Sequence, residues 1–132
     1  MEPLTTPRIG HDLVDIARFS AVLARRAGGF RRRVFTEREW DYAAQRPDRD
    51  AVLAARFAAK EAVFKALQTG WGRGVAWRDA EIRGGGRSAP ELVLSGRARD
   101  IAEALDVHLE ISMSHTDGLA SAVAYAHPRS RA

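Results

Sequence analysis

Residues 51–70 read AVLAARFAAKEAVFKALQTG, and this stretch decides the fold class. It is rich in alanine, leucine, lysine and glutamate, which favour a helix over about residues 51–68. Asp48 or Asp50 can cap the start of that helix, and Gly70 can end it. The apolar residues that recur at helical spacing, and so predict the side that faces a core, are Leu53, Phe57, Phe64 and Leu67.

Upstream of this helix, the sequence predicts one strand and two shorter helices. Apolar and polar residues alternate over 9–14, which is typical of a strand. Apolar residues then fall at helical spacing over about 15–27, until two glycines stop the pattern. The segment 36–39 reads TERE, a capping box in which the first and last side chains bond to each other's backbone N–H groups. We therefore expect a second helix to begin at Glu37.

Downstream, the sequence predicts two hairpins separated by one helix. The glycines of 84–86 mark the first turn, and Asp117-Gly118 is a strong signal for the second. Because strands and helices alternate without a regular βαβ rhythm, we expect an α+β fold. The predicted strands cover 77–83, 91–94, 107–114 and 119–126, and the predicted helix covers 97–105.

Length and composition fit one globular domain. The chain has 132 residues, 45% hydrophobic and 29% charged, and it has no cysteine, which excludes a disulfide scaffold and a thiol nucleophile. No apolar run approaches the ~20 residues of a membrane span, and the start lacks the pattern of a secretory signal. We expect a cytoplasmic protein with a single domain over 1–132, a loose arm at 1–7 and a polar tail at 128–132.

The positive charge is carried almost entirely by arginine. Lysine and arginine number 21 against 17 acidic residues, which gives a net charge of +4. The planar guanidinium suits carboxylates and phosphates, so an anionic partner is expected. Arg18 and Arg25 are seven residues apart and share a helical face with Val22, an arrangement that suits an acidic partner. The run 31–33 is either solvated surface or a phosphate contact.

Two carboxylates stand in positions that suit chemistry. Asp12 falls on the same strand face as Gly10 and Val14, where a carboxylate is costly unless it is paired or bound to a metal. Glu61 and Lys65 are four residues apart on the long helix and border its core-facing side. The alternative is an ordinary exposed salt bridge between Glu61 and Lys65, worth a few tenths of a kcal/mol.

The segment 112–116 reads SMSHT and places His115 where a strand enters a turn. A catalytic triad of Ser114, His115 and Asp117 is disfavoured, because successive strand residues point to opposite faces and no nucleophile elbow surrounds the serine. A hydrogen-bonded histidine in a hairpin is the alternative interpretation.

Four segments, taken in order, resemble the holo-[acyl-carrier-protein] synthases, the small bacterial class of 4′-phosphopantetheinyl transferases. The resemblance covers about residues 8–126, and its most specific part is the helix motif followed by Lys65. It implies a long central helix packed on a mainly antiparallel sheet. The segments read GHDLVDIAR at 10–18, RVFTERE at 33–39, ARFAAKEA at 55–62 and SMSHT at 112–116.

The resemblance implies a reaction and its catalytic residues. The 4′-phosphopantetheine arm of coenzyme A (CoA) would pass to a serine of an apo acyl carrier protein, leaving adenosine 3′,5′-bisphosphate. Asp12 and Glu61 would hold Mg²⁺, which typically takes one or two carboxylates plus substrate phosphates. Lys65 would contact the same phosphates. The proton acceptor stays open between Glu61, a metal-bound water and His115.

The resemblance also implies the binding surfaces. It implies a homotrimer with active sites between subunits, a role in fatty acid biosynthesis and lipid metabolism, and no nucleic acid or membrane partner. His11 departs from the family, which usually has an aliphatic residue there, and the stretch 28–33 carries an extra residue. The residues expected to contact CoA are Arg33, Arg56, Lys65, Gly70, Gly72 and His115. The residues expected to dock the carrier protein are Arg18, Val22, Arg25 and Phe30.

Two other functions compete with this interpretation. A small basic nucleic-acid-binding module would use the arginine clusters, with Trp71 or Trp77 as stacking platforms. The second competing function is a protein that binds CoA without catalysing transfer. The presence of Asp12, Glu61 and Lys65 argues against it.

Overall fold

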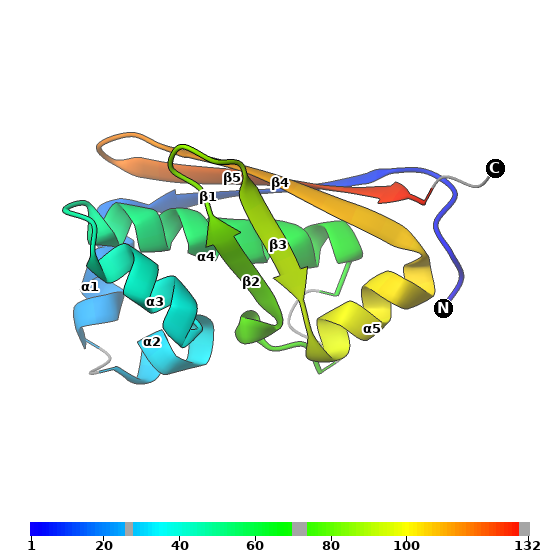
Figure 1. Ribbon diagram of the computed structural model, residues 1–132, viewed down its shortest axis with the longest axis horizontal. Helices are drawn as coiled ribbons and strands as arrows, with labels where there is room; N and C mark the ends of the chain where they lie inside the picture. Colours follow the sequence, from blue (N-terminus) through cyan, green and yellow to red (C-terminus); the bar gives the residue numbers. More distant parts are fainter. Residues whose placement is uncertain (26–27, 70–73, 130–132) are drawn as a thin grey trace.

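One long helix, α4 (Arg49–Leu67), runs through the centre of the molecule. The computed structural model describes residues 1–25, 28–69 and 74–129. A three-stranded sheet lies along one side of α4, and the short helices and a two-stranded hairpin lie along the other (Figure 1). The α+β fold with a central helix on an antiparallel sheet is therefore confirmed. Within the described ranges, no helix is both long and apolar enough to cross a membrane.

The three-stranded sheet is antiparallel throughout, in the order β1-β5-β4. Its inner face is built from small residues, because the β5 residues that face α4 are the alanines at 120, 122, 124 and 126, all buried. A Cβ added to Gly10 of β1 would collide with the carbonyl oxygen of Ala62 on α4, so only glycine fits there. The strands are β1 (Arg8–Asp15), β4 (Val107–His115) and β5 (Leu119–Pro128).

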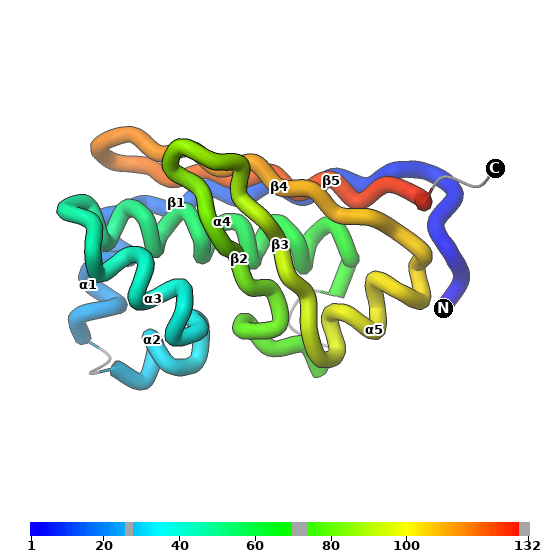
Figure 2. The backbone as a smooth tube through the Cα atoms, in the orientation of Figure 1, coloured from blue at the N-terminus to red at the C-terminus, as the bar shows by residue number. Residues whose placement is uncertain are grey.

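The opposite layer consists of short elements that cover the other side of α4 (Figure 1). Figure 2 shows that the N-terminal arm and the end of β5 lie at the same end of the molecule, where the N–H of Leu4 donates to the carbonyl of Leu105 at 2.9 Å. The elements are α1 (Ile16–Arg25), α2 (Gly29–Val34), α3 (Glu37–Ala44), η1 (Trp77–Asp79), β2 (Ala80–Gly84), β3 (Pro90–Leu94) and α5 (Gly96–Leu105).

The predicted capping box is confirmed at the start of α3. The N–H of Thr36 donates to Oε1 of Glu39 at 2.9 Å, and the N–H of Glu39 donates to Oγ1 of Thr36 at 3.2 Å. Asp48 is the N-cap residue of α4, but its side chain makes no capping hydrogen bond. α4 therefore begins two residues earlier than the sequence predicts, without a side-chain cap.

One helix was not predicted, and one predicted strand begins too early. The first helix, α1, ends before the two glycines as predicted, but Gly28 takes a left-handed φ of 88° and the chain then enters a separate helix, α2. The ring of Phe30 holds α2 against the core, 5.9 Å from the ring of Phe57. Residues 77–79 form η1 instead of a strand, because Oδ2 of Asp79 accepts the N–H groups of Ala76 and Ala98.

A buried ion pair joins α4 to the layer that covers it. Nζ of Lys60 lies 2.8 Å from Oε1 of Glu39 and donates to the carbonyls of Ala80 at 2.7 Å and Trp77 at 3.3 Å. The other carboxylate oxygen of Glu39 accepts the N–H of Ile82 at 2.9 Å. Burial lowers the pKa of Lys60, and the Glu39 carboxylate opposes that shift. Both side chains are fully buried, so each depends on the other for compensation.

We predict that Lys60→Met lowers the free energy of unfolding by about 3–5 kcal/mol, because it leaves the Glu39 carboxylate buried without its cation. Urea denaturation followed by circular dichroism measures this loss. The double variant Lys60→Met/Glu39→Gln removes both charges and keeps an acceptor for Ile82, so it is expected to be more stable than Lys60→Met alone. A double variant no more stable than the single one contradicts the assigned role of the pair.

Candidate active site

Asp12 and Lys65 meet where β1 crosses α4. Nζ of Lys65 lies 3.0 Å from Oδ1 of Asp12 and donates to the carbonyl of His11 at 2.9 Å. Within the described residues, Lys65 forms its ion pair with Asp12 and not with Glu61 on its own helix. The interpretation of Glu61 and Lys65 as an ordinary surface salt bridge is therefore wrong, and the pairing that Asp12 requires on its strand face is present.

Glu61 shares a hollow with Asp12. Its pKa is raised first by burial and then by the negative charge of Asp12, while Lys65 opposes the shift. The hollow has a volume of about 440 Å³, and its walls combine the charged residues Asp15 and Arg18 with apolar side chains that include Phe19, Phe57 and Val22. Two carboxylates held together on apolar walls are a costly arrangement unless a positive group joins them.

The two carboxylates suit a divalent cation such as Mg²⁺, which prefers oxygen ligands. Among the described residues, no group of three or more histidine, aspartate or glutamate side chains is placed to hold a metal. Asp12 and Glu61 therefore fit an ion that takes its remaining ligands from water and from a phosphorylated substrate.

A second hollow, of about 250 Å³, lies around the guanidinium of Arg56. Arg56 is only 3% exposed, and burial lowers its pKa. One of its terminal nitrogens donates to the carbonyl of Gly84, and its guanidinium carbon lies 4.5 Å from the ring centroid of Tyr42. Its Nε has no hydrogen-bond partner within the described part of the chain. Arg46 also lines the hollow, and two guanidinium groups together favour an anionic ligand.

His115 lies at the edge of the same hollow, at the end of β4. Its Nε2 is 3.3 Å from Oδ2 of Asp48, the residue that precedes α4. The acidic neighbour of His115 is therefore not Asp117, in keeping with the prediction that no catalytic triad forms here. Gly85 and Gly86 line the hollow from the tip of the β2–β3 hairpin, both at positive φ. Arg56 and His115 thus line one hollow, a candidate anion-binding surface.

The two hollows lie on different sides of α4 and have no lining residue in common. Arg56 and Glu61 are five residues apart on the helix, which corresponds to a rotation of about 140°. One copy of the chain therefore presents the carboxylates and the anion-binding surface separately.

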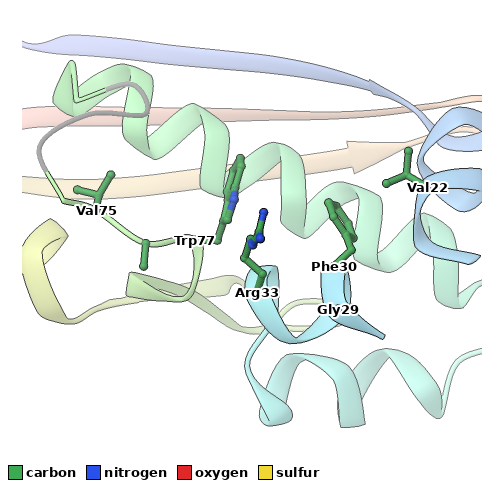
Figure 3. A pocket seen from close by; sticks show the side chains of 7 residues that line it. Val22, Gly29, Phe30, Arg33, Val75 and Trp77 are labelled. Atoms are coloured by element: carbon green, nitrogen blue, oxygen red, sulfur yellow. The ribbon is translucent and has the colours of Figure 1, made fainter. Parts of the chain in front are cut away.

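A third hollow lies between α1, α2 and η1, and it is the largest of those described here, at about 850 Å³ (Figure 3). Arg33 lines it, and not the hollow of Asp12 or that of Arg56. Trp77 forms part of its wall and is only 7% exposed, so it offers no exposed stacking platform for a base. The sequence patterns gave no sign of this hollow, because α2 was not predicted.

The expected docking residues surround the mouth of the carboxylate hollow. Arg18 and Val22 of α1 line it together with Phe30 of α2, and Arg25 is exposed at the end of α1. Gly70, Gly72 and Trp71 lie outside the described residues.

Comparison with known proteins points to one family. A family model described as the 4′-phosphopantetheinyl transferase superfamily matches residues 8–124. The chain is 46% identical to a holo-[acyl-carrier-protein] synthase of Gloeobacter violaceus, over 82% of this chain and 83% of that protein. It is 45% identical to one of Anaeromyxobacter dehalogenans, over 86% of this chain and 90% of that protein.

Solved structures of similar proteins share the fold. The crystal structure of a holo-[acyl-carrier-protein] synthase from Neisseria meningitidis aligns with a TM-score of 0.82 at 28% identity, covering 91% of this chain and 97% of that one. The synthase from Bacillus anthracis, solved in complex with CoA (3′,5′-ADP), aligns with a TM-score of 0.75 at 30% identity, covering 92% and 96%.

Proposed function

The chain belongs to the 4′-phosphopantetheinyl transferase superfamily, and from this premise we propose that it acts as a holo-[acyl-carrier-protein] synthase. It transfers the 4′-phosphopantetheine arm of CoA to a serine of an apo acyl carrier protein and releases adenosine 3′,5′-bisphosphate. The observation that carries this conclusion is the hollow that Asp12 and Glu61 share, with Lys65 paired to Asp12, beside a helix surface suited to an acidic protein.

The proposed reaction needs Mg²⁺, which Asp12 and Glu61 would hold. When bound, the ion offsets the negative charge that builds up on the leaving bisphosphate. Lys65, whose side chain is half exposed beside Asp12, adds a positive charge to the phosphates from the next turn of α4.

CoA would use the anion-binding surface of Arg56 and His115 for a phosphate of its nucleotide end. Because that surface and the carboxylate hollow lie on different sides of α4, we propose that a second copy of the chain completes each active site. The outer face of the three-stranded sheet supports this assembly, which the family resemblance implies is a homotrimer. Its large exposed apolar residues are Ile9, Leu13, Leu119, Val123 and Tyr125.

The carrier protein would dock on α1. Arg18 and Arg25 flank the partly buried Val22, and Phe30 continues the apolar strip from α2. Arginines around an apolar strip suit an acidic helical partner, since charge steers the encounter and apolar contact holds it. We assign the reaction to fatty acid biosynthesis, within the lipid metabolism of the cytoplasm, because the relatives are named for acyl carrier protein.

We predict that Asp12→Asn and Glu61→Gln each lower the rate of transfer by about 10²–10³-fold, because each removes an oxygen ligand and a charge from the reacting phosphates. The assay incubates apo carrier protein with CoA and Mg²⁺ and weighs the carrier by intact mass spectrometry. EDTA is expected to stop the gain in mass. Glu103→Gln on α5 is the matched control, and normal transfer by Glu61→Gln would overturn the assignment.

We predict that the double variant Arg18→Glu/Arg25→Glu raises the KM for the carrier protein at least about tenfold while changing the KM for CoA far less. The physical reason is like-charge repulsion between α1 and the acidic carrier. Arg38→Glu/Arg99→Glu changes the net charge equally from other helices and serves as the control. Equal KM values for the carrier in both double variants would reject α1 as the docking surface.

We predict that two inactive variants, Glu61→Gln and Arg56→Met/His115→Ala, regain transfer activity when they assemble together. In a trimer assembled at random from equal amounts of the two variants, about one quarter of the shared sites combine an intact Glu61 from one copy with an intact Arg56 and His115 from the next. Co-expression of the two variants, followed by the mass assay and light scattering, measures recovery and assembly together. A monomer, or a mixture without recovery, contradicts the shared site.

A further inference from the structure

The largest hollow carries one cation on apolar walls. Val22 of α1, Phe30 of α2, and Val75 and Trp77 beside η1 supply apolar surface around a volume of about 850 Å³. In Figure 3 the side chain of Arg33 rises from α2 between Trp77 and Phe30, toward α4. No acidic residue stands among the described residues that line this hollow.

This hollow adjoins the carboxylate hollow. Val22 and Phe30 line both, so the two volumes are separated by the side chains of the same two residues. A group attached to a phosphate beside Asp12 and Glu61 can therefore extend past Phe30 toward Arg33. On the proposed function, on which this inference rests, the group attached to that phosphate is the pantetheine arm with its terminal sulfur.

Arg33 gives this hollow a preference among the groups that such an arm can carry. Apolar walls favour an alkyl chain. Among the described residues, no ion pair offsets the charge of Arg33, and a guanidinium forms paired hydrogen bonds to a carboxylate. The ligand that satisfies both features is a short alkyl chain that ends in a carboxylate.

We propose that Arg33 is a specificity-determining residue that selects acyl-CoA donors whose acyl group ends in a carboxylate over neutral acyl groups of the same length. The carrier serine oxygen bonds to the phosphorus that bears the pantetheine arm, and the bond from that phosphorus to the leaving bisphosphate breaks. The bisphosphate keeps the electron pair, and the serine proton passes to an acceptor in the carboxylate hollow. The thioester is unchanged, so the carrier receives the intact acyl-phosphopantetheine.

The test compares glutaryl-CoA with valeryl-CoA, which have acyl chains of equal carbon number and differ in the terminal carboxylate. Intact mass spectrometry of the carrier gives kcat/KM for each donor, with free CoA as the reference. The wild-type protein is expected to prefer glutaryl-CoA, and Arg33→Met is expected to lower the glutaryl-to-valeryl ratio by at least about tenfold. Arg33→Lys keeps the charge without the paired donors and is expected to fall between them.

Arg32→Met is the matched control, because it removes the same charge from the same helix at a residue that does not line the hollow. A ratio that falls equally in Arg32→Met and Arg33→Met overturns the proposal, as does a wild-type ratio at or below one. Failure of both acyl donors while free CoA reacts also overturns it and leaves the proposed function intact. No transfer from free CoA overturns the proposed function itself.

Discussion

The close contact between α4 and the inner face of the sheet is the constraint on which the rest of the structure depends. Alanines of β5 face α4, and Gly10 of β1 leaves no room for a Cβ against the carbonyl of Ala62. Since both backbones approach this closely, the helix cannot rotate or slide without a clash. The side chains of α4 therefore have fixed directions, and Asp12 on β1 lies within reach of Lys65.

The fixed direction of α4 separates its charged residues into three environments. Lys60 points away from the sheet, and its charge is neutralised by Glu39 while its N–H groups donate to backbone carbonyls. It therefore joins α4 to the layer that covers it and has no donor left for a ligand. Glu61 lines the carboxylate hollow, and Lys65 is half exposed beside it, paired with Asp12. Arg56 is buried with a free Nε beside His115. The same helix thus stabilises the fold and lines two separate hollows, and their separation is the physical argument for the proposed site shared between copies.

Most of the element pattern followed from local sequence. The helix over residues 51–68, the capping box at Thr36 and the strand pairs at the end of the chain were predicted correctly, because each depends on neighbours in sequence. The helix α2 was not, because its stability comes from Phe30 packing on Phe19 and Phe57, contacts that no local pattern encodes. Trp77 was wrongly predicted to lie in a strand, because the turn that contains it depends on a contact distant in sequence. Oδ2 of Asp79 accepts the N–H of Ala98 at the start of α5.

By itself, the sequence determined the family and named the candidate site residues, because the motif around Glu61 and Lys65 and the strand around Asp12 are continuous segments. Only the tertiary structure decided which of these residues meet. It paired Lys65 with Asp12 instead of Glu61, placed Arg56 and His115 on the other side of α4, and set Arg33 in a hollow of its own. Such placements depend on how helices and strands pack across long separations in the chain, where the small side chains at their contacts set the distances.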